Sequence, residues 1–407
     1  MSHRTQVAII GQGYVGLPLA IAACQAGHEV IGLDLNAALV EQLNSGNSHV
    51  EDVDSSLLQK FLKLNTYRST TDARELSDAD VILIAVPTPL STSHEPDLSM
   101  LETAARIVGE NIKTGALVIN ESTSYPGTLR NIIRPIVESS ALTAADIDFA
   151  ISPERVDPGN PTWKIRNTPR LYSGLSQRAK DRAREFYGSF CDELIELSEP
   201  EVAEAAKLFE NTFRLINISL VNELALVFSK MGIDTREVLD AASTKPYGFT
   251  KFNPSVGIGG HCIPVDPNYL LAAAQNAGAN FRFIELANEV NLDMPKNIVN
   301  RIVDAHGGSI TMKKIIVLGV AYKPNIADTR ETPVERLINE LRLCGAEVVW
   351  HDPLVGVWRT EESVDLNSKY DIAILATAHD LLIKINPSSF ADYVFDCSGR
   401  LQNAVQL

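Results

Sequence analysis

The stretch GIGGHCIPVD, residues 257–266, places a cysteine directly after three glycines and a histidine. Cys262 has no second cysteine or histidine at metal-ligand spacing, and the adjacent His261 is poorly placed to share one ion with it. A redox thiol would need a resolving cysteine nearby. A core filler would not need three glycines, whereas a nucleophile would use a loop that lets the backbone approach a substrate. From these residues alone, the nucleophile is one of several open interpretations.

Lys207 and Asn211 stand four residues apart in an apolar stretch, so they share one face if that stretch is helical. A lysine in such a helix needs a function or a partner, because burying an unpaired charge is costly. Lys207 could pair with Glu204, Glu210 or another acid, and Asn211 could be an ordinary buried amide. Asp266 could orient a water or Lys207, or could cap the loop before the next proline.

A second motif, GQGYVG, spaces Gly11, Gly13 and Gly16 as G-x-G-x-x-G. The first glycine permits a tight turn, the second lets a pyrophosphate approach the backbone, and the third brings the helix close to the strand. The motif follows an apolar run, and Asp34 closes the next such run. A carboxylate there would accept hydrogen bonds from ribose hydroxyls and disfavour a 2′-phosphate, so the motif predicts NAD rather than NADP. Alternatively, the glycines form a structural turn and Asp34 caps the following helix.

Buried strands alternate with helices in the first half of the chain. The apolar runs are QVAIIG, HEVIGLD, DVILIAVPTP, ALVINESTSYPG and IDFAISPER, and a helical pattern over residues 17–26 follows the first of them. Strands that are apolar on both faces and alternate with helices predict a parallel, doubly wound sheet.

The pattern changes near Glu199, where a segment that ends at Gly232 predicts one long helix. This helix is apolar on most sides, so it must be covered by its own chain or by another subunit. Alternation resumes near Lys313 with KKIIVLGVAYKP, AEVVWHDP, DIAILATAHD and YVFDCSG. The expected fold is therefore α/β, with two doubly wound Rossmann-like domains joined by a long central helix.

Composition limits the possible functions. At 407 residues the chain is too long for one ordinary core, and 45% apolar with 21% charged residues is typical of a globular protein. A net charge of −15 argues against a nucleic-acid partner. The five cysteines show no C-x-x-C spacing, which argues against disulfides or a cysteine-rich metal site. No secretory signal is recognised, so we expect a cytoplasmic protein with no membrane partner and no metal.

Seven motifs follow one another along the chain: GQGYVG, VPTP, ESTSYPGT, SPER, KLFEN, GIGGHCIPVDP and AYKPNIADTRET. In this order they resemble the UDP-sugar 6-dehydrogenases, the nucleotide-sugar dehydrogenase family that includes UDP-glucose dehydrogenase. The segments STKPYGFTKFNP and SPER…DPGNPTW are most similar to the branch that oxidises UDP-N-acetylglucosamine in bacterial polysaccharide synthesis. The resemblance implies an NAD-binding domain over 1–198, a central helical and dimerisation domain with the cysteine loop over 199–300, a UDP-sugar-binding domain over 301–407, and a homodimer through the central helix.

The resemblance also implies the reaction, a four-electron oxidation of a sugar C6 alcohol to a carboxylate with two NAD molecules. Cys262 matches the family nucleophile, which would form a thiohemiacetal with the aldehyde and then a thioester that water hydrolyses. Lys207 and Asn211 would stabilise the oxyanions that develop.

Other implied roles complete this site. Asp266 would assist proton transfer through water, Thr123 would position that water or the hydroxyl, and Glu154 would be the base for thioester hydrolysis. The implied cofactor residues are Gly11, Gly13, Tyr14, Val15, Gly16, Asp34, Thr88, Ser122 and Arg330. The implied substrate residues are Phe252, Asn253, Gly257, Gly259, Lys323 and Arg400, where the two cations would meet the diphosphate and the loop backbone would wrap the nucleotide.

The chain departs from the family around the sugar. Many members supply an arginine from a neighbouring subunit at the position of Pro246, and UDP-glucose enzymes differ after the glutamate of SPER. UDP-glucose and UDP-N-acetylmannosamine therefore remain alternative substrates. A single-hydride hydroxyacid dehydrogenase would also carry a lysine and an asparagine on a helix, but it needs no cysteine and lacks a second nucleotide-type domain. A non-enzymatic NAD-responsive protein would bind NAD without forming NADH.

Overall fold

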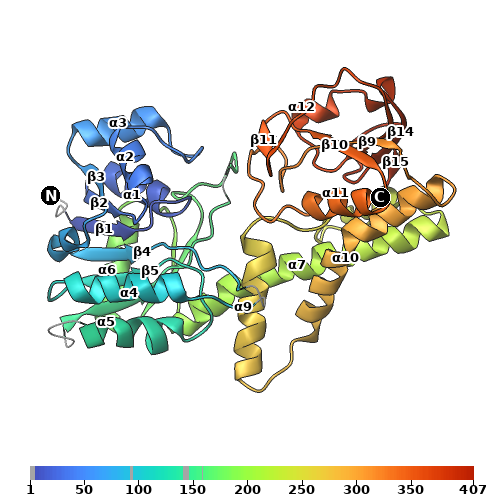
Figure 1. Ribbon diagram of the computed structural model, residues 1–407. Coiled ribbons are helices and arrows are strands. Elements are labelled where there is room, and N and C mark those ends of the chain that lie inside the picture. Colours follow the sequence, from blue (N-terminus) through green and yellow to red (C-terminus); the bar gives the residue numbers. More distant parts are fainter. Residues whose placement is uncertain (1–4, 92–94, 141–145, 158) are drawn as a thin grey trace. The chain divides into compact units, whose positions relative to one another are not determined.

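The computed structural model describes residues 5–91, 95–140, 146–157 and 159–407. They divide into two units (Figure 1). The first unit comprises Met1–Glu210 and Asn268–Ala277, and the second comprises Asn211–Pro267 and Gly278–Leu407.

An eight-stranded sheet with the order β3-β2-β1-β4-β5-β6-β7-β8 forms the centre of the first unit. Its strands are β1 (Gln6–Ile10), β2 (Glu29–Leu33), β3 (Tyr67–Thr70), β4 (Val81–Ile84), β5 (Leu117–Asn120), β6 (Asp148–Ile151), β7 (Arg170–Gly174) and β8 (Leu194–Glu196). Every neighbouring pair is parallel except β6 and β7. The chain runs from β1 to β2 and β3 on one side and then crosses back to β4 on the other side of β1. Such switch points bind ligands beyond the carboxyl ends of the strands.

Helices cover the first sheet. They are α1 (Gly16–Gln25), α2 (Ala37–Asn44), α3 (Ser55–Lys63), α4 (Ser99–Asn111), α5 (Arg134–Ser140) and α6 (Gln177–Gly188), with short turns of helix at Ala73–Asp78 and Leu129–Ile133. Side chains of α1, α3 and α6 share one apolar core with β1, β2, β4 and β5. Helices α4 and α5 pack side by side (Figure 1).

Helix α7 (Pro200–Met231) is the long helix that the sequence predicts. It begins in the first unit and continues into the second. Among the described residues, this helix alone is long and apolar enough by composition to cross a membrane, a test that the core helix of a soluble protein also passes. Several of its large apolar side chains are exposed.

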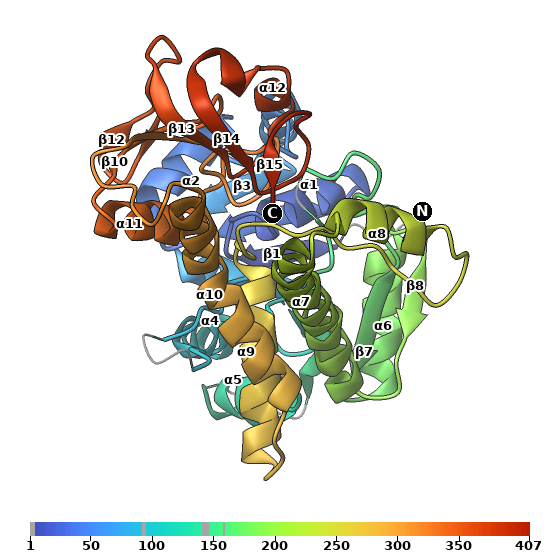
Figure 2. The same cartoon turned by 90° about the vertical axis from the view of Figure 1, so that its right-hand side faces the viewer.

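The second unit contains a smaller, all-parallel sheet with the order β10-β9-β13-β14-β15. Its elements after α7 are α8 (Thr235–Ser243), α9 (Cys262–Asn276), which begins here, α10 (Arg282–Ala305), β9 (Lys314–Leu318), α11 (Val334–Leu343), β10 (Glu347–His351), β11 (Val357–Trp358), β12 (Glu361–Glu362), β13 (Tyr370–Leu375), α12 (Asp380–Ile383), a short helix at Pro387–Ser389, β14 (Ala391–Asp396) and β15 (Val405–Gln406). Helices α10 and α11 cover one face of this sheet, and α12 contributes to the core on the other (Figure 2).

The predicted fold class is confirmed. All nine predicted strands are present, as β1, β2, β4, β5 and β6 in the first sheet and β9, β10, β13 and β14 in the second. The sequence patterns did not reveal the short strands β3, β8, β11, β12 and β15, which have two to four residues each. Strand β7 was also not predicted, although all five of its residues are buried.

Candidate active site

The three glycines of the dinucleotide motif differ in what surrounds them. Gly11 has φ +88°, and a Cβ there would lie 2.4 Å from the carbonyl oxygen of Ala85. A Cβ on Gly16 would lie 1.8 Å from the carbonyl oxygen of Gly11. A Cβ on Gly13 would meet nothing within 4 Å. The fold itself therefore requires the first and third glycines, whereas the second leaves an open face that suits a pyrophosphate.

Asp34 follows β2 and is bound to this loop. Its carboxylate accepts hydrogen bonds from the backbone amides of Gln12 and Asn36, each at 2.9 Å. Asn36, not Asp34, caps α2, because its side chain accepts from the amides of residues 38 and 39. The capping alternative for Asp34 is therefore wrong. Its half-buried carboxylate lies beside the glycine loop, where the predicted ribose contact would occur.

Thr88 and Ser122 are buried beyond the carboxyl ends of β4 and β5. The Ser122 hydroxyl lies 2.9 Å from both the amide nitrogen and the carbonyl oxygen of Val86. It therefore joins the loop after β4 to the loop after β5. Thr123 is half-buried on the second of these loops, and Tyr14 is exposed on the glycine loop. The predicted contacts of these side chains with cofactor and substrate stay predictions.

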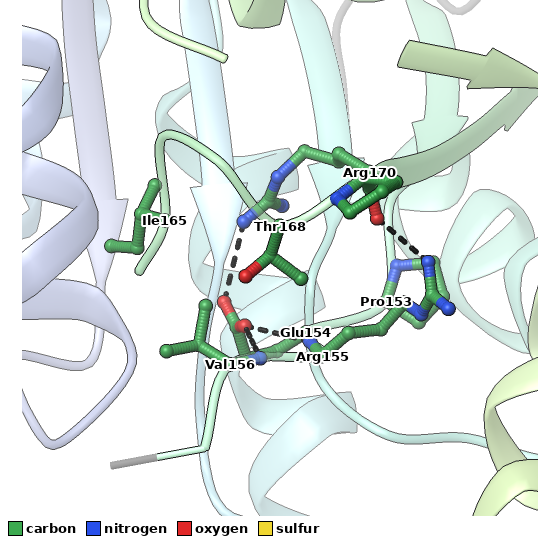
Figure 3. A pocket seen from close by; sticks show the side chains of 8 residues that line it. Pro153, Glu154, Arg155, Val156, Ile165, Thr168 and Arg170 are labelled. Carbon is green, nitrogen blue, oxygen red and sulfur yellow. Dashed lines mark hydrogen bonds and ion pairs between the residues drawn. The ribbon is translucent and has the colours of Figure 1, made fainter. Parts of the chain in front are cut away.

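Glu154, which follows β6, lines a small pocket (Figure 3). Its Oε1 accepts hydrogen bonds from the amides of Arg155, at 2.6 Å, and Val156. Its Oε2 lies 3.3 Å from Nη2 of Arg170. Thr168 lines the same pocket, and its buried hydroxyl has no hydrogen-bond partner among the described residues. The predicted base is therefore fixed in one orientation.

Arg170 also forms an ion pair that the sequence did not predict. Its Nη1 lies 2.7 Å and 2.8 Å from the carboxylate oxygens of Glu121, and both side chains are buried. The Tyr187 hydroxyl donates to the same carboxylate. Burial acts to lower the pKa of Arg170, but Glu121 and Glu154 outweigh it and hold that pKa above its ordinary value. Burial raises the pKa of Glu121 to about 7, although Arg170 opposes this rise.

Glu204 anchors the start of α7 within the first unit. Its carboxylate accepts from the amides of Gly127, at 2.6 Å, and Leu129, at 3.0 Å, and from the Ser124 hydroxyl at 3.2 Å. Burial raises the pKa of Glu204 to about 7, although these hydrogen bonds lower it. The helix that carries Lys207 is therefore tied to the loop that carries Thr123.

Lys207 does not pair with either acid that the sequence suggested as its partner. Glu204 is bound as described, and Glu210 forms an ion pair with Arg155 at 2.7 Å. Lys207 is half-buried and forms no ion pair within the described residues. No carboxylate of the described residues therefore occupies its ammonium group.

The cysteine loop belongs to the second unit. Cys262 is exposed and is the first residue of α9, and a helix N-terminus favours negative charge. Two buried asparagines hold the loop. Asn222 on α7 accepts from the amide of Ser255 at 2.8 Å, and Asn291 on α10 accepts from the amide of Ile258 at 2.6 Å.

The glycines before Cys262 have a packing reason that the sequence did not reveal. A Cβ on Gly259 would lie 2.7 Å from the carbonyl oxygen of Glu331 and 2.9 Å from Cβ of Tyr322. Gly260 has φ +81°, and a Cβ there would lie 2.7 Å from the Tyr322 ring. The chain itself occupies this side of the loop. A contact between the substrate and the backbone of Gly257 or Gly259 stays a prediction.

Asn211 and Asp266 contact each other in the second unit. Nδ2 of Asn211 donates to Oδ2 of Asp266 at 2.6 Å, and both side chains are buried.

Burial and the nearby Arg330 lower the pKa of His261. The neutral form of the imidazole beside Cys262 is therefore favoured.

The predicted ligand cations lie on two loops of the second unit. Lys323 is half-buried on the loop after β9, and Arg400 is exposed after β14. Arg330 pairs with Asp328 at 2.9 Å, and its carbonyl oxygen accepts from the amide of Gly260 at 3.2 Å. The Arg330 loop and the cysteine loop are therefore neighbours.

Two more of the predicted substrate residues lie before the cysteine. Phe252 packs edge-on against Phe213 of α7 with ring centroids 5.8 Å apart, and Asn253 is exposed.

The structure thus assembles two groups of predicted residues, one in each unit. The first holds the glycine loop, Asp34 and the ends of β4, β5 and β6, and the second holds the cysteine loop, Asn211, Asp266 and the Arg330 loop. Residues that the sequence analysis missed are Glu121, Arg170, Asn222, Asn291 and Tyr322. Glu121 and Tyr322 lie within the motifs ESTSYPGT and AYKPNIADTRET, and Asn222 could have been noticed as an amide inside an apolar helix, but nothing marked Arg170 or Asn291. Across the described residues, no group of three or more His, Cys, Asp or Glu side chains could hold a metal ion.

Comparison with known proteins identifies the family. Family models match residues 5–191 (UDP-glucose/GDP-mannose dehydrogenase family, NAD binding domain), 201–293 (central domain) and 316–403 (UDP binding domain). The chain is 35% identical to UDP-N-acetyl-D-mannosamine dehydrogenase of Pyrococcus horikoshii, over 94% of this chain and 91% of that protein. It is 34% identical to UDP-N-acetyl-D-glucosamine 6-dehydrogenase of Pseudomonas aeruginosa, over 92% and 90%.

A solved structure supports the same relationship. The UDP-D-ManNAc dehydrogenase of Pyrococcus horikoshii matches with a TM-score of 0.90 at 32% identity, covering 98% of each chain. The predicted family resemblance is confirmed, and this chain belongs to the UDP-glucose/GDP-mannose dehydrogenase family of NAD-dependent UDP-sugar dehydrogenases.

Proposed function

We propose that the enzyme oxidises the C6 hydroxyl of a UDP-N-acetylhexosamine to a carboxylate, with UDP-N-acetylglucosamine as the first candidate. The observation that carries this proposal is the similarity, over more than nine tenths of the chain, to enzymes named for UDP-N-acetyl-D-mannosamine and for UDP-N-acetyl-D-glucosamine. These sugars are C2 epimers, and both carry a 2-acetamido group. The segments around SPER and before the cysteine loop favour the glucosamine branch.

The first unit fits the cofactor, since Gly13 leaves an open face and Asp34 lies beside it. When bound, NAD accepts a hydride from C6 in each of the two oxidations. The side chains of the protein would manage charge and protons. Asp266, which accepts from the Asn211 amide, would take part in proton removal through water. Lys207 and Asn211 would stabilise the oxyanions.

Cys262 explains how an alcohol dehydrogenase site can reach a carboxylate. Its sulfur would bond to the aldehyde carbon, and the oxyanion formed becomes a thiohemiacetal that can release a second hydride. The product is a thioester on Cys262. Water would then add to the thioester carbon, a proton would pass to Glu154, and the C–S bond would break to release the thiolate. The exposed position of Cys262 at the start of α9 supports this role.

The exposed side of α7 supports assembly as a homodimer. Phe209, Phe213, Leu220 and Val227 are 61%, 44%, 50% and 45% exposed. Their spacings of four, seven and seven residues put them on one face of the helix. A second copy of the chain would cover this face.

The test is NADH formation with purified enzyme and four sugars: UDP-N-acetylglucosamine, UDP-N-acetylmannosamine, UDP-glucose and UDP-N-acetylgalactosamine. We expect the highest kcat/KM with the first and two NADH per sugar consumed. Comparable values with all four would contradict the substrate assignment, and one NADH per sugar would contradict the four-electron reaction. Cys262→Ser should lose the second half of the reaction, and full four-electron turnover by this variant would remove Cys262 from its role.

A further inference from the structure

We propose that Arg170 is a positioning residue for thioester hydrolysis: held by Glu121, it orients the Glu154 carboxylate toward a water molecule in the pocket that Glu154 and Thr168 line. This inference rests on the proposed function, because it assigns to Glu154 the hydrolytic step. It adds Arg170 and Thr168, which lie outside the seven motifs of the sequence, and it gives a role to Glu121, the first residue of ESTSYPGT.

The reversed direction of β7 brings Arg170 to the site. Glu121 and Ser152 follow the carboxyl ends of the parallel strands β5 and β6. Strand β7 runs antiparallel to β6, so its first residue, Arg170, lies at the same edge of the sheet. A parallel β7 would have put this residue at the opposite edge. The Ser152 hydroxyl lies 3.0 Å from Nη1 of Arg170.

Because Glu121 binds one nitrogen of the Arg170 guanidinium group, the two terminal nitrogens of that group contact different carboxylates. Both oxygens of Glu121 are bound to Nη1, and Nη2 is directed at Glu154 (Figure 3). Without Glu121, the guanidinium could turn to bind Glu154 through both nitrogens, the geometry that arginine and carboxylate prefer. Such a pairing would occupy both oxygens of the base. The Tyr187 ring, 4.7 Å from the guanidinium carbon, also restricts this movement.

The hydrogen bonds of Glu154 leave one direction for a water. A carboxylate has about four lone-pair positions, and Oε1 already accepts from two amides. Oε2 accepts only from Arg170 among the described residues, at 3.3 Å, so one position on Oε2 remains. This oxygen lies in the pocket, which has room for about one water.

Thr168 provides independent support for the water. Its hydroxyl is buried and has no partner among the described residues, and it lines the same pocket. Buried hydroxyls are almost always hydrogen-bonded, so an unpartnered one beside a polar pocket indicates a water site. A water between this hydroxyl and Oε2 of Glu154 would have two protein contacts that hold it for attack on the thioester carbon. Its proton would pass to Oε2, and the thiolate of Cys262 would leave.

The experiment follows the covalent adduct on Cys262. Wild type, Arg170→Gln, Thr168→Val and Glu154→Gln would be mixed with excess NAD and UDP-sugar, quenched in acid and weighed as intact protein. We expect the thioester to accumulate in all three variants but not in wild type. We expect kcat to fall about tenfold or more in Arg170→Gln and Thr168→Val, with a rapid burst of two NADH per Cys262. The ratio kcat/KM should stay unchanged, because slower hydrolysis of the thioester lowers kcat and KM together.

Other outcomes would overturn the inference. If Arg170→Gln loses the NADH burst and turnover in equal proportion, without adduct, the arginine acts only on the fold. If Arg170→Gln does not fold, Thr168→Val remains a test, since it removes only an unpaired hydroxyl, and absence of adduct in that variant refutes the water site. If Glu154→Gln traps the thioester and Arg170→Gln and Thr168→Val do not, this inference alone fails. If wild type forms no NADH with any UDP-sugar, the proposed function fails instead.

Discussion

The glycines of the dinucleotide loop allow a prediction in which neighbouring, similar substitutions have opposite consequences. Gly16→Ala places a methyl group 1.8 Å from the carbonyl oxygen of Gly11. Both groups belong to the backbone, so relief requires the turn and α1 to separate. Overpacking of this kind costs about 1–3 kcal/mol or more. For a unit of this size, each 1 kcal/mol lowers Tm by about 2–4 °C.

Gly13→Ala should behave differently. Nothing lies within 4 Å of the added methyl group, and Gly13 does not have a left-handed φ. The substitution should therefore leave the free energy of unfolding unchanged or raise it by about 0.4–1 kcal/mol, because alanine has less freedom in the unfolded chain. The methyl would, however, occupy the face that the pyrophosphate of NAD should approach. We expect the Kd for NAD to rise at least about tenfold, a loss of about 1.4 kcal/mol.

The assay is thermal unfolding of the full chain without ligand, together with calorimetric titration of NAD. Gly115→Ala is a control for Gly11→Ala, because Gly115 also has a left-handed φ, +79°, but open space around it. Gly11→Ala should lower Tm more than this control, and the difference measures the clash with Ala85. Wild-type NAD affinity in Gly13→Ala would refute the cofactor position, and a wild-type Tm in Gly16→Ala would refute the packing argument.

Three further perturbations test other parts of the structure. Burial raises the pKa of Glu204 to about 7 in the folded state, so its contribution to stability is complete below about pH 4.5 and is lost as the pH rises through 7. Urea unfolding should therefore show a smaller loss of stability between pH 5.5 and pH 8 in Glu204→Gln than in wild type. An equal loss in both proteins would contradict the raised pKa. His379 accepts from the amide of Asn325 at 2.9 Å and, through its other nitrogen, contacts Asp352 at 3.1 Å. Asn325 lies on the loop that carries Lys323, so His379 should hold this loop in place. His379→Asn and His379→Gln, which each keep one of the two contacts, should therefore raise KM for the UDP-sugar without changing NAD affinity. An unchanged KM would show that His379 does not position the Lys323 loop. Leu220→Glu should produce monomers in light scattering, and an unchanged dimer, or a monomeric wild type, would exclude α7 as the interface.

The sequence predicted what depends on local pattern. Strands that are apolar on both faces, the glycine turn and the long α7 all have signals that lie within one segment. The interactions of Arg170 could not be predicted in this way. Its partner Glu121 is 49 residues away in the sequence. The contact also requires β7 to run antiparallel to β6, and the residues of one strand do not encode that direction.

The cysteine loop shows the same limit within the site itself. The glycines indicated a close approach, and the structure shows one, but the approaching group includes Tyr322 of the same chain. The glycines near Cys262 therefore predicted that another group lies close to the loop backbone, but they did not predict which group it is. Asn211 and Asp266, considered separately in the sequence, share a hydrogen bond that joins α7 to the start of α9.

The two sheets repeat one local design, and the differences explain why only the first should bind NAD. Gly11 and Gly319 each follow a first strand, with φ +88° and +83°, and a Cβ on each would lie 2.4 Å and 2.3 Å from the carbonyl oxygen of Ala85 and Thr377. Asp352, like Asp34, closes the next strand and accepts from the amide of the residue after this glycine.

The resemblance ends at the ligand side of the turn. The second turn reads GVAYKP where the first reads GQGYVG, so alanine replaces the glycine that would admit a pyrophosphate and proline replaces the third glycine. Asp352 is fully buried, and the amides of residues 320, 354 and 355 and the ring of His379 surround its carboxylate. This carboxylate is therefore not available to bind a ribose as Asp34 would. The same loop instead carries Lys323, a cation suited to a diphosphate, so turns of similar geometry would serve the cofactor in the first unit and the nucleotide sugar in the second.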